Sequence, residues 1–434
     1  MIKNKLTQMR LIAMTLLTGA SVLATVTAAS AGAFAINEQS TVGTGMAYAG
    51  VAAGGTLSDQ FWNPATLGDV HGFQTETDLT AILPYVNVNT NPTLLGGVLP
   101  VAGQRDGNVG INALVPASNY AYRVNQNIIL GLGINSPFDL ATSYPGSSAL
   151  NSNLGNAGIA GTSRIFSIDV NPNIAYQFNE QLTIAVGLQA QYMEARETSF
   201  LQPAGILSGS THNLGWGYTL GIDYKPMKGT SIGLGYRSGI DNTINGSITG
   251  LTAGGVPLPG QQGDLKLRTP GIATLGISQD VGDFWTVKGG VQYTNWAVLG
   301  TAPLSGNAGA RVAAVIGTAG IPFNYKDAWM FSTGAEYKFR PDTTLRAGIG
   351  YETSPIDNSN RSFRLPDADR LWLSAGASYA FSKTVSVDFG YSFLHAFGST
   401  ILNGATGPVI NGPFSGSFNG NVHIVSMALK MKFD

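Results

Sequence analysis

Cysteine is absent from this chain of 434 residues, and charged residues make up only 11% of it. The missing thiols exclude a disulfide framework and any thiolate metal site. After residue 31, no apolar run approaches the length of a membrane-spanning helix. A chain of this length ordinarily forms two or three soluble domains, but 57 glycines and so little charge are unusual for soluble domains. The low charge therefore requires another explanation.

Residues 1–31 have the three parts of a secretory signal peptide. Lys3, Lys5 and Arg10 give a basic start, residues 11–29 are apolar or small, and Ala29-Ser30-Ala31 forms a cleavage site. An uncleaved membrane anchor is the alternative, because residues 11–29 are about as long as a membrane span. Cleavage removes 31 of the 434 residues and predicts a mature chain of 403 that begins at Gly32. That chain has 21 Lys and Arg against 25 Asp and Glu, a net charge of minus four, which does not favour nucleic-acid binding.

From about residue 163 onward, apolar residues alternate with small or polar ones in units of about ten residues. In one unit Trp216, Tyr218, Leu220, Ile222 and Tyr224 alternate with glycines, a threonine and an aspartate. Such alternation predicts strands with one face toward lipid and the other toward water, and aromatic residues gather where these strands would meet the membrane interfaces. A soluble β-sandwich also alternates, so the connections between the strands have to decide.

Tight links and long links alternate along fourteen predicted strands. The predicted strands start near residues 72, 108, 127, 163, 182, 214, 230, 264, 285, 328, 343, 370, 384 and 421. Tight links include 125–126, 179–180 and 382–383, and long links include 137–162, 298–327 and 397–420. Short turns on one side, long loops on the other and an even strand count are typical of bacterial outer-membrane proteins. We therefore predict an all-β fold, a 14-stranded antiparallel transmembrane β-barrel over residues 72–434.

A barrel of this size needs a plug or a water-filled channel, because it is wider than side chains alone can fill. Residues 32–71 precede the first strand, lack alternation and are too apolar for a disordered tail. They are the predicted N-terminal hatch inside the barrel.

Two sets of motifs resemble the FadL family of outer-membrane transporters. The first set comprises Asn37-Glu38-Gln39, the run from Gly43 to Gly50 (Gly-Thr-Gly-Met-Ala-Tyr-Ala-Gly), and Asn63-Pro64-Ala65. The second set lies in the C-terminal third and comprises Lys326-Asp327-Ala328, Ser354-Pro355, Asn360-Arg361-Ser362 and a run from Leu365 to Gly376 (LPDADRLWLSAG). Both sets follow the family order, and with the strands between them the resemblance covers nearly all of the mature chain.

The resemblance implies a fourteen-stranded barrel with a hatch, a hydrophobic pocket that the mature N-terminus enters, and lateral exit through a gap at the third strand. It places Phe34 and Ile36 in the substrate pocket and Gly131, Gly133 and Pro137 on the opening strand. Asn63, Pro64 and Ala65 suit a rigid corner that holds the hatch, since proline fixes a backbone angle and asparagine caps turns.

Two departures from the family pattern leave the substrate open between fatty acids and uncharged hydrocarbons. The loop after the fifth strand, long in relatives that take fatty acids, spans only about residues 202–213 here. Residues 316–325 carry no charge, so no carboxylate partner can be placed there.

Charged residues on the polar strand face are expected in the lumen, because charges turned toward lipid are costly. They are Arg237, Glu336, Lys338, Arg346 and Asp388. Salt bridges that line the wall or hold the hatch are the first interpretation, and contact with a substrate head group is the second. The four histidines, His71, His212, His395 and His423, have no metal-ligand spacing, and no context marks a nucleophile. The sequence thus predicts no metal site, no catalytic residue and no cofactor.

A passive transporter of hydrophobic small molecules is the leading hypothesis, and a general porin for small polar solutes is the alternative. A porin would keep an open lumen with a charged constriction and would lack an apolar plug. An outer-membrane enzyme is a distant third. After signal-peptide cleavage the protein is expected in the Gram-negative outer membrane, with outer-membrane lipid, lipopolysaccharide and the barrel-assembly machinery as partners besides its substrate.

Overall fold

A computed structural model describes residues 32–95, 99–148, 150, 160–198, 200–201, 205–207, 209–251, 257–316, 319–406 and 411–433. The predicted signal peptide, residues 1–31, lies outside the described residues. Among the described residues, no helix is long and apolar enough to cross a membrane.

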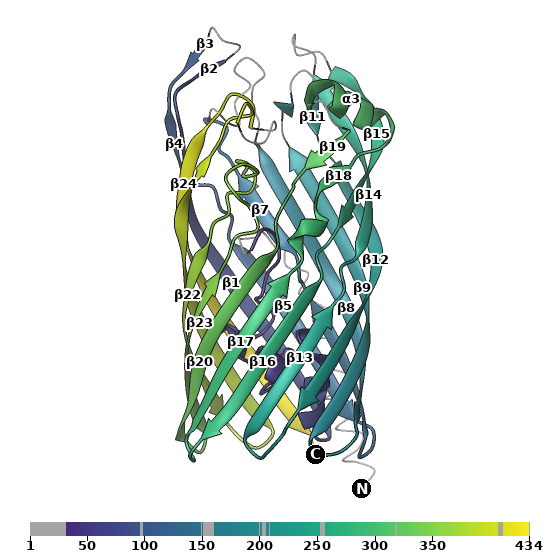
Figure 1. The fold of residues 1–434 in the computed structure, drawn as a ribbon, viewed down its shortest axis with the longest axis vertical. Coiled ribbons are helices and arrows are strands. Elements are labelled where there is room, and N and C mark those ends of the chain that lie inside the picture. Colours follow the sequence, from purple (N-terminus) through teal and green to yellow (C-terminus); the bar gives the residue numbers. More distant parts are fainter. Residues whose placement is uncertain are drawn as a thin grey trace.

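Fourteen antiparallel strands form a closed barrel, as the sequence predicted (Figure 1). Each strand pairs with its neighbour in the chain, and the last strand closes the barrel by pairing with the first along eighteen residues. Closure pairs the backbone groups that lipid could not satisfy. The barrel strands are β1 (Phe73–Thr90), β5 (Ala113–Arg123), β6 (Ile128–Asn135), β8 (Thr162–Gln177), β9 (Leu182–Thr198), β12 (Gly209–Tyr224), β13 (Thr230–Arg237), β16 (Ile272–Val281), β17 (Trp285–Thr294), β20 (Ala328–Arg340), β21 (Thr343–Glu352), β22 (Arg370–Ala380), β23 (Val385–Ile401) and β24 (Gly416–Phe433).

Tight turns close the lower end of the barrel in Figure 1, and long connections rise above its upper end. The lower end is the periplasmic one, since outer-membrane barrels have their short turns there. The described parts of the upper connections contain further strands and a helix: β2 (Thr93–Leu95), β3 (Leu99–Val101), β4 (Gln104–Asn108), β7 (Asp139–Ser143), β10 (Phe200–Leu201), β11 (Gly205–Leu207), β14 (Asp241–Leu251), β15 (Pro257–Arg268), β18 (Thr301–Pro303), α3 (Gly306–Ile316) and β19 (Gly320–Pro322). A turn of 3-10 helix, η5 (Trp296–Val298), follows β17.

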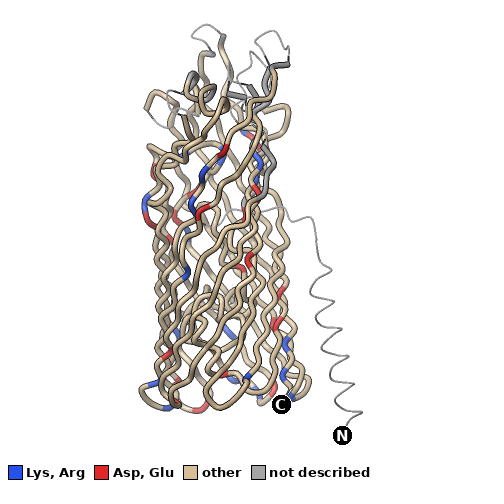
Figure 2. Tube along the Cα trace, turned by 90° about the vertical axis from the view of Figure 1, so that its right-hand side faces the viewer, with Lys and Arg blue, Asp and Glu red and all other residues tan. Residues whose placement is uncertain are grey.

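The two faces of the wall differ in polarity as the alternation predicted. In β12, Trp216, Tyr218 and Leu220 are exposed on the outside, whereas Thr219 and Asp223 are buried inside. Charged residues gather at the lower turns and in the upper part of the barrel (Figure 2). The outer wall therefore offers lipid an apolar band, which accounts for the low overall charge.

Two predicted strand starts lie in other strands. Asn108 is the last residue of β4, and the barrel strand β5 begins at Ala113. A strand was expected near Asp264, but that residue lies in β15, which pairs with β14 in a hairpin outside the barrel sheet. The barrel strand β16 begins at Ile272, after the break at Pro270 and Gly271. In β15, Leu265 and Leu267 alternate with charged residues, so this strand outside the barrel has the same side-chain alternation as a membrane strand.

The segment from Gly32 to Val70 lies inside the barrel and is almost entirely buried (Figure 1). It contains α2 (Thr41–Thr44), η1 (Val51–Ala53), η2 (Leu57–Phe61) and η3 (Pro64–Asp69). Two carboxylates of β1 hold it. Glu76 accepts hydrogen bonds from the amides of Leu57 (2.8 Å) and Ser58 (3.1 Å), and Asp78 accepts one from the amide of Thr41 (2.7 Å).

Wall glycines let this segment approach the strands closely. A Cβ atom at Gly233 would lie 1.7 Å from the carbonyl oxygen of Ala52, and one at Gly235 would lie 1.9 Å from that of Trp62. Any larger residue would push the segment off the wall, which gives these glycines of β13 a packing role.

Candidate functional site

An apolar cavity of about 100 Å³ lies in the upper part of the barrel. Its walls come from β8, β9, the outer strand β15, the chain around β19 and the loop before β22. The apolar residues that line it are Phe34, Ile165, Ala195, Leu265, Leu267, Ile321, Pro322, Phe323, Tyr325 and Leu365. Concave apolar sites with a few polar groups are typical of small-molecule binding.

Phe34 is the only residue of the N-terminal segment that lines this cavity. Its side chain is fully buried, and its ring meets Trp296 edge-on with 4.6 Å between centroids and Phe138 with 5.9 Å. Ile36 is also buried, but it packs in a different cluster with Trp372 and Met330. The structure thus brings Phe34 to the cavity and places Ile36 away from it.

Three arginines line the same cavity: Arg164, Arg196 and Arg364. Arg164 and Arg196 lie directly opposite each other on β8 and β9. Guanidinium groups beside an apolar wall suit a molecule that has an alkyl body and an anionic head.

The third barrel strand, β6, stops pairing with β5 after Ile134. Among the described pairings, residues 113–117 of β5 therefore have no partner in β6, while β5 keeps its pairing with β1. After Asn135 the chain turns inward, and Pro137 accepts a hydrogen bond from the amide of Ile36 (3.0 Å). The amide of Asp139 donates to the carbonyl of Phe34 (3.0 Å), so the N-terminal segment pairs with the chain that leaves the third strand.

Of the residues predicted for the opening strand, two lie in the paired part of β6 and one lies after the pairing ends. Gly131 and Gly133 lie on the lumen side of β6, and a Cβ atom at Gly131 would lie 2.5 Å from Leu67 of the N-terminal segment. Pro137 lies in the break itself. Gln39 fastens the break, since its amide nitrogen donates to the carbonyl of Ser136 (2.7 Å) and its oxygen accepts from the Ser136 amide (3.0 Å).

Asn63 joins the N-terminal segment to the wall. Its side-chain nitrogen donates to the carbonyls of Ala52 (2.7 Å) and Ile222 (2.9 Å), and its oxygen accepts from the amide of Ala65 (3.0 Å). The side chain caps η3, and Pro64 occupies the first position of that helix. The geometry is that of a fixed corner.

Of the predicted lumen charges, Arg237 is buried and pairs with Asp169 of β8. Its guanidinium also donates to the carbonyl of Phe61 (3.0 Å) and lies 4.2 Å from the centroid of the Phe61 ring. Arg237 therefore links two strands and the N-terminal segment.

Glu336, Arg346 and Asp388 form a chain of ion pairs inside the wall. The Nε atom of Arg346 lies 3.1 Å from Glu336, and its Nη1 atom lies 3.7 Å from Asp388. Lys288 joins the chain at 3.6 Å from Glu336. Lys338, on the same strand as Glu336, is exposed near the lower end.

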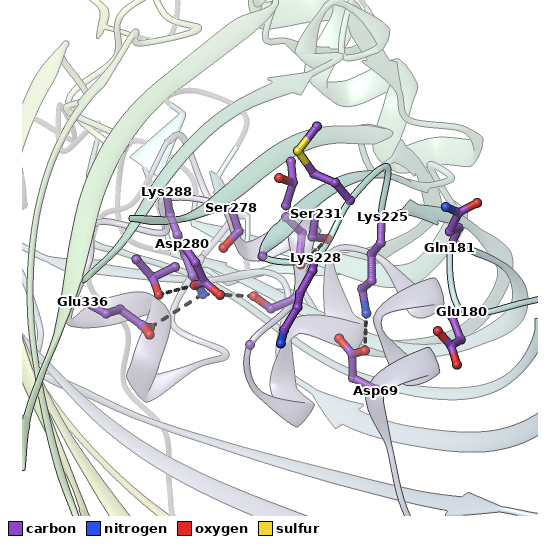
Figure 3. Close-up of a pocket in the computed structure, with 17 residues that line it drawn as sticks. Asp69, Glu180, Gln181, Lys225, Lys228, Ser231, Ser278, Asp280, Lys288 and Glu336 are labelled. Atoms are coloured by element: carbon purple, nitrogen blue, oxygen red, sulfur yellow. Dashed lines mark hydrogen bonds and ion pairs between the residues drawn. The ribbon is translucent and has the colours of Figure 1, made fainter. Parts of the chain in front are cut away.

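A second cavity, of about 650 Å³, is lined by residues of the lower turns and of the N-terminal segment, which places it at the periplasmic end. Figure 3 shows its lining residues. Charged side chains point into it from both sides, including Lys225, Lys228, Asp280 and Glu336. Lys288 donates to the carbonyl of Gly54 (3.0 Å) at its upper edge. The two cavities therefore differ in chemistry, apolar above the N-terminal segment and charged below it.

Among the described residues, no group of three or more acids and histidines is placed to hold a metal ion. His395 is exposed and His423 is half-buried, and they hydrogen-bond to Asn421 and Tyr391, respectively (2.8 Å each). Neither lines a described cavity.

A family model described as "Outer membrane protein transport protein (OMPP1/FadL/TodX)" matches residues 21–433. The chain belongs to this family. It is 26% identical over 407 residues to the long-chain fatty acid transport protein of Escherichia coli K12, covering 83% of this chain and 87% of that protein. It is 28% identical over 413 residues to outer membrane protein P1 of Haemophilus influenzae, covering 84% and 86%. This protein is therefore located in the outer membrane.

Solved structures of the OMPP1/FadL/TodX family share the fold. A Pseudomonas aeruginosa FadL homologue superposes with a TM-score of 0.78 at 19% identity, covering 93% of this chain and all of that one. The Pseudomonas putida toluene transporter TodX superposes with a TM-score of 0.68 at 18% identity, covering 93% and 99%.

The sequence did not predict that Arg164, Arg196, Arg364 and Trp296 lie around Phe34 and the apolar cavity. These residues are far apart in the chain, and only the folded loops and strands bring them together. The chain between β9 and β12 is even shorter than expected, residues 199–208. The hairpin of β14 and β15 and the chain around α3 occupy the upper rim beside it (Figure 1). Leu265 and Leu267 of β15 line the cavity beside the short connection between β9 and β12.

Proposed function

We propose that the protein is a passive outer-membrane transporter that takes up hydrophobic small molecules and releases them sideways into the bilayer. The apolar cavity closed by Phe34 is the single observation that carries this proposal. Relatives of both named kinds, a fatty acid transport protein and a toluene transporter, support a hydrophobic substrate. The proposal includes no catalytic step.

The charge of the cavity lining favours fatty acids over uncharged hydrocarbons as substrates. Arg164, Arg196 and Arg364 supply positive charge beside the apolar residues of the lining, which also includes the uncharged polar residues Ser163, Asn360 and Ser362. Charge-assisted hydrogen bonds to a carboxylate are stronger than those between neutral groups. The sequence offers no charged partner for a carboxylate in residues 316–325. We infer that Arg164 of β8, Arg196 of β9 and Arg364 of the loop before β22 take that role.

Sideways release follows from the contrast between the two cavities. Moving an alkyl chain into water costs about 0.8 kcal/mol per methylene, so sixteen carbons face on the order of 12 kcal/mol. The way down leads into the charged cavity beneath the N-terminal segment. We infer that the break after β6, where β5 and β6 no longer pair, is the way into lipid. The same segment that carries Phe34 is hydrogen-bonded to this break, so displacement of Phe34 and opening of the break can occur together.

A general porin would need an open lumen, and the buried N-terminal segment argues against it. Uptake of labelled oleate, hexadecane and toluene by cells with and without the protein tests the proposal directly. We expect oleate to enter fastest through the protein. Equal uptake of all three with and without the protein, together with faster entry of small sugars, would support the porin.

A binding comparison tests the role of the arginines. Oleate should lose about tenfold affinity in Arg196→Gln, in line with about 1.4 kcal/mol for a partly solvated charged contact. Methyl oleate should bind both forms alike, and the exposed Arg268→Gln is the matched control outside the cavity. An equal loss for acid and ester would assign Arg196 to packing.

A further inference from the structure

A buried group of acids surrounds the start of the N-terminal segment. Glu38, Glu352 and Asp367 are at most 7% exposed, and Arg370 is 4% exposed. Arg370 pairs with Asp367, and its Nε atom lies 3.6 Å from Glu352. Arg361, the next buried guanidinium, donates to the backbone carbonyl of Asp367 (2.7 Å) and not to its carboxylate. Three buried carboxylates thus lie around one directly bound guanidinium group, with Arg361 acting on Asp367 at longer range. Such burial is costly unless a carboxyl is protonated or a further cation is present.

Two of these carboxylates converge on the first described backbone nitrogens. The amide of Gly32 hydrogen-bonds to the Glu352 carboxylate, and the amide of Ala33 lies 3.4 Å from Asp367 Oδ2. A Cβ atom at Gly32 would lie 2.4 Å from Glu352 Oε1, so the carboxylate closes directly over this residue. The other oxygen of Glu352 accepts from the indole of Trp372 (3.0 Å), which fixes its orientation.

The sequence predicts signal-peptide cleavage between Ala31 and Gly32. After cleavage, the nitrogen of Gly32 is no longer an amide with one proton. It is an α-ammonium group with a positive charge and three protons to donate.

We propose that Glu352 and Asp367 form a binding site for this α-ammonium group, so that removal of the signal peptide creates a buried ion pair. The α-ammonium group supplies positive charge to this group of acids. A charge-assisted hydrogen bond in a buried site is stronger than the amide contact that the precursor makes there. The ion pair holds the chain two residues before Phe34 and thereby fixes where Phe34 enters the apolar cavity.

The proposal rests on the cleavage position and not on transport, so it can be tested without a substrate. Mature protein is purified from outer membranes, its first residue is identified by mass spectrometry, and the α-amine is acylated competitively over a range of pH. We expect Gly32 as the first residue. Its acylation should be at least about tenfold slower than in urea-unfolded protein, because the amine reacts only when the segment opens locally. We expect its pKa above the ordinary value of about 7.7 to 8.0.

Isosteric variants separate an ion pair from simple burial. Glu352→Gln and Asp367→Asn should speed acylation and lower the amine pKa, whereas Asp357→Asn, an exposed acid of the same loop, should change neither. Insertion of one Thr after Ala31 moves the ammonium by about 3.8 Å and leaves every side chain of the site in place. This extended chain should label rapidly.

Three outcomes would overturn the proposal. One is a mature chain that begins elsewhere than Gly32. The second is an amine that labels as fast in the folded protein as in the unfolded one. The third is a protected amine whose pKa is lowered and is insensitive to both isosteric variants, since burial without a carboxylate partner lowers the pKa of an amine.

Discussion

Phe34 has an aromatic ring on two sides and the apolar cavity on another, so its removal enlarges the cavity without touching the barrel wall. We expect Phe34→Ala to change ligand affinity several-fold and to leave the barrel folded. Burial of such a side chain contributes roughly 1.5 to 3 kcal/mol to the packing of the N-terminal segment. Calorimetric titration with oleate measures affinity, and gel mobility with and without heating reports the barrel. Phe418→Ala, a buried phenylalanine of β24 outside the cavity, is the control. Unaltered binding in folded Phe34→Ala would remove this residue from the site.

Asp59 makes the N-terminal segment sensitive to pH. Burial raises the pKa of its carboxyl to about 7, although Lys288 and the amide of Thr56 oppose the shift, and Glu76 and Glu336 add to it. The folded form therefore favours the protonated acid. Its stabilising contribution is complete below the ordinary pKa near 4 and is lost as the pH rises through 7.

Hydrogen exchange of residues 51–63, corrected for intrinsic rates, should be slower at pH 5 than at pH 8. One pKa unit corresponds to about 1.4 kcal/mol, so the effect is on the order of a few kcal/mol. Asp59→Asn keeps the hydrogen bond from Thr56 and should flatten the pH dependence. If the dependence persists in that variant, another group is responsible.

At the scale of elements, Asn63 and η3 form the corner that fastens the N-terminal segment to β12. Asn63→Ala removes the hydrogen bonds to Ala52 and Ile222 and uncaps η3, at a cost of about 1 to 3 kcal/mol for each buried group left unpaired. The segment should loosen, and single-channel conductance and sensitivity to large antibiotics should rise. Asn91→Ala, an exposed asparagine in an outer loop, should leak no more than the wild type. Wild-type conductance in Asn63→Ala would show that other contacts hold the segment.

Alternation of side chains made the barrel strands predictable, because each strand separates lipid from lumen and so repeats every two residues. The same rule misplaced one strand at Asp264, since an outer hairpin that covers a cavity also separates two environments. Strand β16 begins only after Pro270, which interrupts the strand pairing, and alternation of side chains alone does not predict such an interruption. The cavity arginines were not predictable, since their proximity depends on the register of β8 and β9 and on loop paths that no local pattern encodes.

At the scale of the whole molecule, the N-terminal segment separates an apolar cavity from a charged one and also pairs with the break in the third strand. Phe34 and Ile36 make hydrogen bonds to Asp139 and Pro137, so the segment closes the cavity and the gap with the same few residues. A substrate that displaces Phe34 therefore acts on both. In the proposed route the break leads to lipid, whereas charged side chains line the cavity below.

A disulfide between the segment and the break tests the lateral route. Ala35 and Phe138 face each other in an antiparallel bridge, and such pairs have the Cα spacing that disulfides require. The chain has no native cysteine to interfere. Ala35→Cys with Phe138→Cys should stop delivering oleate when oxidised, because the bond holds the segment against the break, and reduction should restore uptake in the same cells.

Thr41→Cys with Ser426→Cys is the matched control, because it also ties the segment to the wall, on β24 and away from the third strand. The hydroxyl oxygens of these two residues are 2.6 Å apart, so the pair is close enough to be bridged. Oxidation of this control should leave uptake within about twofold, as the route through the break keeps its own hydrogen bonds free to open. Oleate delivered at full rate while the bond between residues 35 and 138 is verified as intact would mean that the substrate leaves by another path.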